Sequence, residues 1–123
     1  MKLHADIDAT RNTVTAYGPG YLEINRERHR GPVLVRPEGA VLDWGVDSFE
    51  TLAPAHFERL LELGPELVLL GTGERQRFPH PALTVALAHA RIGFEVMDTR
   101  AACRTYNILV AEGRVVLAAM LPL

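Results

Sequence analysis

The second half of the chain changes repeatedly between two hydrophobic periods, and this alternation limits the folds that it can adopt. From Pro54 onward, segments with a helical apolar stripe are separated by short, continuous apolar runs of the kind that form buried strands. The order is helix, strand, helix, strand, helix, strand. Such an order is the signature of an α/β domain whose parallel strands are joined by crossover helices.

Proline, threonine and glycine mark the ends of the three expected helices. Proline is favoured in the first turn of a helix, and glycine often follows the last turn. We expect the first helix between Pro54 and a stop at Gly64, and the second across residues 80–93, which also begin near a proline and end at a glycine. Thr99 is expected to cap a third helix that runs to about Glu112.

Three strands are expected between and after these helices. They cover residues 67–70, 94–97 and 115–121. The last of them shows no alternation with polar residues, and this pattern predicts a strand that is buried on both faces.

The first half of the chain is expected to form hairpins. Residues 13–17 and 21–25 are β-rich runs around a Gly-Pro-Gly turn, and residues 33–35 and 40–44 form a second such pair. Hairpins contribute antiparallel strands, so the sequence predicts a mixed sheet. The length of 123 residues indicates a single α/β domain over residues 1–123.

Charge and hydropathy argue against two classes of partner. The net charge of −2 does not suit a broad surface for nucleic acid or for an anionic membrane. The longest apolar runs are far shorter than the ~20 residues of a membrane span. The N-terminal residues also lack the apolar core of a signal peptide. We therefore expect a cytoplasmic protein that binds no nucleic acid and does not span a membrane.

The cysteine and histidine residues do not indicate a metal or a cofactor. Cys103 is the only cysteine, so a disulfide framework or a thiolate metal cluster is not expected. A cysteine in the middle of a helix is usually a small core residue, and a nucleophile is the lesser alternative. The five histidines are scattered without a His-x-x-x-His pair, so we expect no zinc site.

A basic run, RERHR at residues 26–30, stands out in the first half. It has no interleaved aromatic residues, so a solvated edge or loop is the main interpretation. A contact with a partner is the alternative.

The Gly-Thr-Gly stretch at residues 71–73 is the first candidate for a binding site. Ligands of parallel sheets bind beyond the carboxyl ends of the strands. If the strands at 67–70 and 94–97 are neighbours, the loops that follow them face one crevice, where free helix N–H groups and arginines favour an anion. The candidate crevice residues are Gly71, Thr72, Gly73, Arg75, Asp98, Thr99, Arg104, Tyr106 and Asn107.

Each part of this crevice also has a structural interpretation. The dinucleotide fingerprint requires a third glycine where Gln76 stands, and no Gly-Lys-Ser/Thr of a P-loop follows. Gly71 and Gly73 suit a tight turn after a strand equally well. Tyr106 could orient a ligand or satisfy a buried acceptor. The residues alone therefore leave both an anion site and a structural turn open.

Three stretches, VLDWGVDSF, ELVLLGTG and FEVMDTRAACRTYNILVAEGRVV, resemble a family of small proteins of unknown function. The family is spread through bacteria and archaea. It includes the mitochondrial assembly factor three of respiratory complex I, and a vertebrate adipogenesis-associated protein carries a related domain. The resemblance extends from about Tyr17 to Leu121, and its most specific parts are the Gly-Thr-Gly loop and the segment from Thr99 to Asn107.

The resemblance implies a three-layer α/β fold around a central mixed five-stranded sheet and no established catalytic activity. The mitochondrial member acts by binding other proteins during complex assembly. The resemblance therefore implies a non-catalytic protein-interaction or assembly-factor-like module with unknown protein partners. The alternative is a protein that binds a small molecule or anion, or an enzyme, and uses the crevice at the Gly-Thr-Gly loop.

Overall fold

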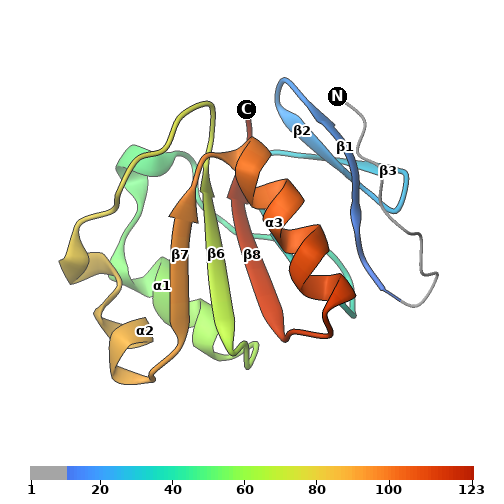
Figure 1. The fold of residues 1–123 in the computed structure, drawn as a ribbon. Coiled ribbons are helices and arrows are strands. Elements are labelled where there is room, and N and C mark those ends of the chain that lie inside the picture. Colours follow the sequence, from blue (N-terminus) through green and yellow to red (C-terminus); the bar gives the residue numbers. More distant parts are fainter. Residues whose placement is uncertain (1–10) are drawn as a thin grey trace.

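The computed structural model describes residues 11–123, which form three layers with a five-stranded sheet as the central one (Figure 1). The strand order is β5-β4-β8-β6-β7. β8 lies in the middle and pairs in parallel with β6 and antiparallel with β4. The strands span Val33–Val35 (β4), Leu42–Asp43 (β5), Leu67–Thr72 (β6), Gly93–Met97 (β7) and Val116–Leu121 (β8). The predicted α/β fold with a mixed sheet is confirmed.

The first hairpin forms as predicted, but it does not join the central sheet. Its strands β1 (Val14–Gly18) and β2 (Tyr21–Ile24) pair with β3 (Glu27–Arg30) in a separate antiparallel sheet. The basic run thus contains an edge strand, which is largely exposed, in agreement with a solvated edge. Only the second hairpin, β4 and β5, extends the central sheet, and β5 is shorter than the five residues predicted.

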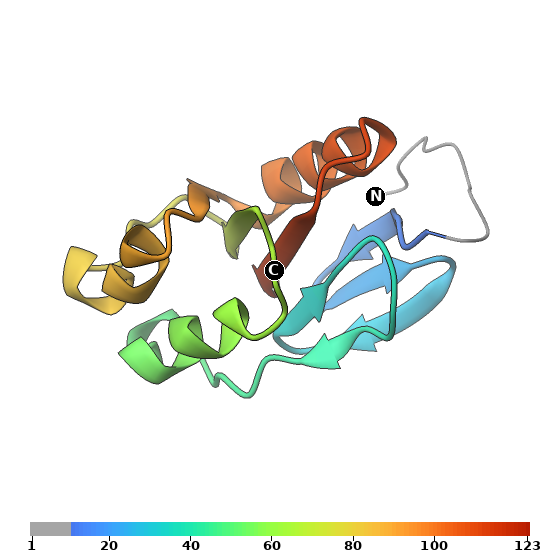
Figure 2. The same cartoon turned by 90° about the horizontal axis from the view of Figure 1, so that it is seen from below.

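Two crossover connections place the helices on opposite faces of the central sheet. From β6 the chain passes through α2 (Val85–His89) to the edge strand β7, and then returns through α3 (Thr99–Ala111) past β6 to β8. Because crossovers in parallel sheets are right-handed, an outward and a returning connection must use different faces. α3 accordingly covers one face, and α1 (Pro54–Leu61) and α2 cover the other (Figure 2).

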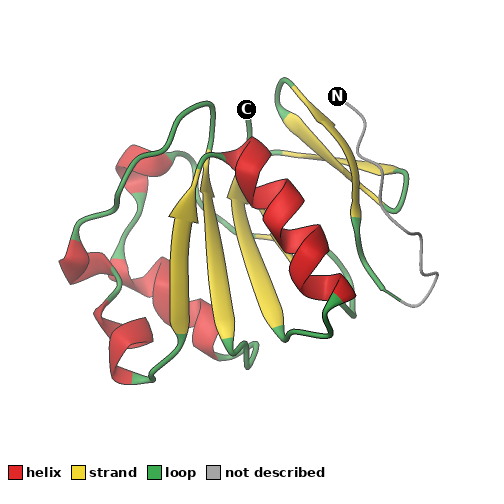
Figure 3. Ribbon diagram, viewed as in Figure 1, coloured by secondary structure: helices red, strands yellow, loops and turns green. Residues whose placement is uncertain are grey.

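The second predicted helix is shorter than expected and is divided. A single 3₁₀ turn, η2, spans Pro81–Leu83, and α2 spans Val85–His89 (Figure 3). Thr84 separates them because its φ of −110° lies outside the helical region. Arg91 then adopts a left-handed conformation with φ 58°, which ends the helix before Gly93.

The central sheet separates two hydrophobic cores. Leu69, Ala118 and Met120 face α3 and the small sheet, and the alternate residues Leu70 and Leu117 face the helices on the other side. Every residue of β8 is buried, so the prediction that this strand is buried on both faces is confirmed. Across residues 11–123, no helix is long and apolar enough to cross a membrane.

Candidate functional site

The two loops predicted to share a crevice do meet. β6 and β7 are parallel neighbours, with Gly71 in register with Met97. Beyond this point, the Gly73 N–H donates to Thr99 Oγ1 at 2.8 Å, and the Thr99 N–H donates to the Gly73 carbonyl at 2.9 Å. The Gly-Thr-Gly loop and the start of α3 are therefore joined directly to one another.

Thr99 has a different role from the predicted helix cap. Asp98 is the N-cap of α3, because its side chain accepts the N–H of Ala101 at 3.0 Å. The Thr99 side chain is fully buried, and its hydroxyl donates to the Leu121 carbonyl at 2.6 Å while it accepts from Gly73. A single hydroxyl thus links the ends of β6 and β8 to the first turn of α3.

Thr72 organises the segment that leaves the loop. Its hydroxyl lies within donating distance of two carbonyl oxygens, that of Arg75 at 2.7 Å and that of Met97 at 3.2 Å. The same oxygen accepts the N–H of Arg77 at 3.1 Å. These contacts fold residues 72–77 into a compact turn against the end of β7. The threonine of the motif thus bonds to backbone groups of the chain itself.

The two glycines of the motif are required for separate reasons. A Cβ atom at Gly71 would lie 2.7 Å from Met120 Sδ and 3.0 Å from Thr99 Oγ1, so α3 could not pack as closely on β6. Gly73 has a φ of 94°, a conformation that other residues rarely adopt. Both requirements belong to a tight strand-to-helix junction.

The charged groups near this junction are directed outward. Arg75 and Arg104 are exposed, and Arg100 lies 3.4 Å from Glu74 in a surface ion pair. The N–H groups of Gly73 and Ala101 already have acceptors within the chain. A structural turn accounts for each of these contacts, while anion binding at the loop stays a prediction.

Tyr106 and Asn107 lie elsewhere, on the part of α3 that faces the small sheet. The Tyr106 hydroxyl donates to the Asn12 carbonyl at 2.9 Å, and burial raises the pKa of this phenol. Asn107 bonds to the N–H and the carbonyl of Val14, each at 2.8 Å. Since they are about two helical turns from Thr99, these side chains are not brought together with the Gly-Thr-Gly loop.

Cys103 is a core residue of α3. Its side chain is fully buried in the cluster between α3 and the sheets. Burial raises the pKa of the thiol to about 12, a shift that Arg104 opposes only in part. A nucleophile needs an accessible thiolate, so this environment favours the core interpretation.

The turn after β6 presents an exposed aromatic residue. The Arg77 guanidinium lies 4.1 Å from the ring centroid of Phe49 and 2.6 Å from a Glu50 carboxylate oxygen. The backbone N–H of Arg77 donates to Thr72 Oγ1. The next residue, Phe78, is 73% exposed. The residue before Phe78 is thus held by several contacts, while the Phe78 side chain extends into solvent. No sequence pattern indicated this exposed aromatic residue.

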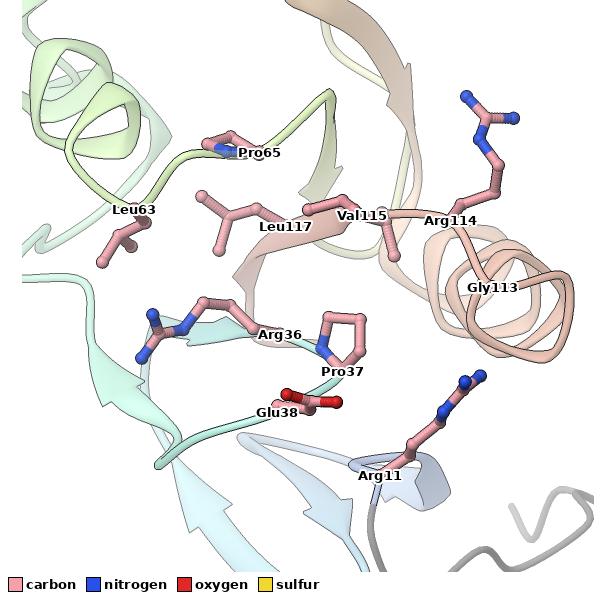
Figure 4. A pocket seen from close by; sticks show the side chains of 11 residues that line it. Arg11, Arg36, Pro37, Glu38, Leu63, Pro65, Gly113, Arg114, Val115 and Leu117 are labelled. Carbon is pink, nitrogen blue, oxygen red and sulfur yellow. The ribbon is translucent and has the colours of Figure 1, made fainter.

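A pocket lies at the opposite end of the sheet, beside the amino ends of β6 and β8 (Figure 4). It has a volume of about 310 Å³. Four separate segments contribute to it: Arg11, residues 36–38, Leu63 with Pro65, and residues 113–117. The described residues 11–123 contain no group of three or more histidine, cysteine or acidic side chains that could hold a metal ion.

The family model described as "Protein of unknown function (DUF498/DUF598)" matches residues 14–121. The chain belongs to this family. Curated relatives named NADH dehydrogenase [ubiquinone] 1 alpha subcomplex assembly factor 3 are 34% identical over 111 residues in Bos taurus and 35% identical over 118 residues in Danio rerio. These alignments cover 89% and 94% of this chain, and 60% and 67% of the respective relatives. The chain thus spans about 60% of the length of the first of them.

Solved structures share the fold of this family member. A crystal structure from Bordetella parapertussis has 44% identity and a TM-score of 0.87, covering 92% of this chain and 97% of the other. A solution structure from Bordetella pertussis, described as a Mth938-like domain, has 38% identity and a TM-score of 0.79, covering 99% and 92%. The resemblance proposed from the sequence motifs is confirmed.

Proposed function

We propose that this family member is a non-catalytic, assembly-factor-like module that acts by binding a protein partner. The observation that carries this proposal is the similarity to proteins named as assembly factors, which extends over 89% of this chain. The matched region includes the Gly-Thr-Gly loop and the segment from Thr99 to Asn107, which contain most of the candidate binding residues. In this fold, polar side chains of both segments bond to backbone groups of the chain, which supports a structural role for them.

The bonds made by the polar side chains support a non-catalytic role. The hydroxyl groups of Thr72, Thr99 and Tyr106 all bond to backbone carbonyls. Asn107 is likewise committed to Val14. Side chains with these partners stabilise junctions between elements, and they would have to break native bonds in order to contact a substrate.

The turn after β6 is the surface that we assign to the partner. Aromatic side chains dominate the energetics of protein interfaces when they insert into a pocket of the partner. Phe78 is highly exposed, while Arg77 beside it is fixed by Phe49, Glu50 and Thr72. Because the neighbouring Arg77 is already held in place, binding through Phe78 would cost less conformational entropy than binding through an unanchored segment.

Chemical crosslinking and affinity capture from the cytoplasmic fraction of the native host would test this proposal. Wild type is compared with Phe78→Ala, and Ile108→Ala is the matched control, since Ile108 is also an exposed apolar residue, 60% exposed, but lies on α3. We expect one defined protein to be retained by wild type and by Ile108→Ala. The loss of a hot-spot aromatic residue costs about 2 kcal/mol, or roughly thirtyfold in Kd, so Phe78→Ala should retain far less.

Two outcomes would contradict the proposal. Equal retention by wild type and Phe78→Ala would remove the turn from the interface. Failure of wild type to retain any protein in a stoichiometric complex would contradict the protein-binding role itself. Thermal unfolding of each variant establishes that a loss of capture does not reflect a loss of fold.

A further inference from the structure

The pocket at the amino ends of β6 and β8 has the size and composition of a small-ligand site. Its volume of about 310 Å³ lies at the lower end of the range for ligand pockets, roughly 300–1,000 Å³. It lies at the other end of the sheet from Phe78 and the Gly-Thr-Gly loop. Its occupancy therefore does not depend on the proposed protein interface.

Apolar side chains form much of the wall. Leu117 and Pro37 lie on opposite sides of the pocket, and Leu63 and Val115 extend the apolar wall on either side of Leu117 (Figure 4). Pro65 also lines the pocket and is itself buried. Val115 is 53% exposed, whereas Leu117 is buried, so Val115 supplies the part of the apolar wall that is open to solvent. An apolar group of a ligand would gain free energy by covering it.

Three arginines surround this apolar wall, and two of them already have acceptors. Arg11 Nη1 donates to the Val110 carbonyl at 2.7 Å, near the end of α3. Arg114 Nε donates to Glu66 at 2.8 Å, and this contact lowers the pKa of the Glu66 carboxyl group.

The third arginine, Arg36, has an unsatisfied buried donor. Its Nε is shielded from solvent and has no acceptor among residues 11–123. A buried donor without an acceptor is a rare feature of folded proteins. The backbone beneath it is fixed, because Asn12 Nδ2 donates to the carbonyls of Arg36 and Gly39 at 2.9 and 2.7 Å. Gly39 also leaves space for the guanidinium, which would lie 3.0 Å from a Cβ atom at that position.

The charged side chains of the lining, three arginines and one glutamate, favour an anionic ligand. Glu38 is the acidic residue of the lining, and Glu66 neutralises Arg114 from outside it. A carboxylate suits the guanidinium of Arg36, which can bind it through two parallel hydrogen bonds.

We propose that this pocket binds a small monocarboxylate with an apolar body. The apolar body covers Leu63 and Val115, and the carboxylate accepts hydrogen bonds from Arg36, whose guanidinium turns toward the pocket. The interaction satisfies the buried Nε–H and replaces water on the exposed face of Val115.

N-acetyl-leucine is a suitable probe, and its neutral amide is the matched ligand. Each is titrated into the full ¹⁵N-labelled chain while NMR records the Arg36 Nε–H and the backbone amides of Gly113 and Leu117. We expect N-acetyl-leucine to shift these resonances saturably and N-acetyl-leucine amide to leave them nearly unchanged. Equal shifts with both compounds, or no saturable shift with either, would overturn the proposal. Saturation by inorganic phosphate at the same concentration would contradict the requirement for an apolar body in the ligand.

Two exposed apolar residues allow a matched pair of variants. Val115→Glu places a negative charge in the pocket wall, and Ile108→Glu places the same charge on α3 outside the pocket. Repulsion at this distance should weaken binding of N-acetyl-leucine roughly tenfold in Val115→Glu. Ile108→Glu should bind like wild type. Equal weakening in both variants would show that the ligand responds to overall charge and would overturn the assignment of the pocket.

Arg36→Gln tests the role of the guanidinium separately. This variant keeps part of the aliphatic stem and a hydrogen-bonding amide, but it is shorter and removes the positive charge. We expect it to bind the acid and the amide equally weakly while its thermal unfolding stays close to that of wild type. A retained preference for the acid would exclude Arg36 as the carboxylate partner.

Discussion

Asn107 completes the edge of a strand that is 93 residues away in the sequence. Its Oδ1 accepts the N–H of Val14 and its Nδ2 donates to the Val14 carbonyl, each at 2.8 Å. A neighbouring β-strand would bond to the same two backbone groups. Because β1 is an edge strand of the small sheet, one side chain of α3 takes the place of a further strand and holds the two sheets together.

Replacement of Asn107 by alanine should therefore weaken the junction between the sheets. Two backbone groups of Val14 would lose their partners, at a cost of about 2–4 kcal/mol in the free energy of unfolding. Urea unfolding measures this loss, and hydrogen exchange at the Val14 amide should accelerate. Ile108→Ala is the control, since an exposed substitution usually changes stability by no more than about 0.5 kcal/mol. Similar unfolding curves for the two variants would contradict the role assigned to Asn107.

The order of elements could be predicted because it depends on local periodicity, while the partition into two sheets could not. The two hairpins have similar local patterns. β4 joins the central sheet because Val33 pairs with Met120 of β8, which is distant in the sequence. The first hairpin packs its apolar residues, Leu22 and Ile24, into the core beneath α3. Only the tertiary arrangement distinguishes these two outcomes.

The candidate site, too, could be predicted from the sequence only in part. The proximity of Gly73 and Thr99 followed from the rule that parallel neighbours bring their carboxyl ends together, and the structure places them in direct contact. The role of Asn107 depends on Val14, which no local pattern links to α3. The pocket around Arg36 could not be predicted, because four segments that are distant in the sequence form it. It also lies at the amino ends of the strands, whereas the rule for parallel sheets concerns their carboxyl ends.

Leu69→Asp should prevent folding. Leu69 is fully buried in β6, between the strands β7 and β8. An unpaired carboxylate at this position would lose its hydration without gaining a partner, at a cost that exceeds about 4 kcal/mol. Circular dichroism should show no cooperative melting. Ile108→Asp introduces the same group at an exposed site and should melt like wild type. Native-like melting of Leu69→Asp would contradict the assignment of this core.

Thr99→Val should destabilise the protein more than Thr99→Ser. Valine has nearly the same shape as threonine but cannot bond to the Gly73 N–H or the Leu121 carbonyl, which are both buried with it. The expected loss is about 2–4 kcal/mol, because two groups become unsatisfied. Serine retains the hydroxyl and loses only a methyl group. Chemical denaturation of both variants gives the comparison, and equal stability would mean that packing alone, without these bonds, fixes the junction.

The thiol of Cys103 should be unreactive in the native state. Its pKa is raised from 9.0 to about 12 by burial, so the native thiol keeps its proton over a range in which the unfolded thiol ionises. The unfolded state therefore binds fewer protons above pH 9, and stability should decrease as the pH rises from 9 toward 12. Ellman's reagent should modify Cys103 only after denaturation. The alkaline decrease should be smaller in Cys103→Ala, and rapid modification of native protein at pH 8 would refute the buried assignment.

Phosphate should not stabilise the protein through the Gly-Thr-Gly loop. The Gly73 N–H already donates to Thr99 Oγ1, and the Ala101 N–H donates to Asp98. Glu74 competes with any added anion for Arg100, and Arg104 is exposed on the next turn of the helix. A bound ligand at about a hundred times its Kd would add roughly 2.7 kcal/mol, which thermal unfolding readily detects.

Wild type and Arg104→Ala are compared in phosphate and in chloride of equal ionic strength. We expect the midpoint of each to be the same in the two salts, because the donors at this junction are already bonded to the chain. A phosphate-specific increase in wild type that disappears in Arg104→Ala would instead establish an anion site at the start of α3. An equal increase in both proteins would place the bound phosphate away from Arg104.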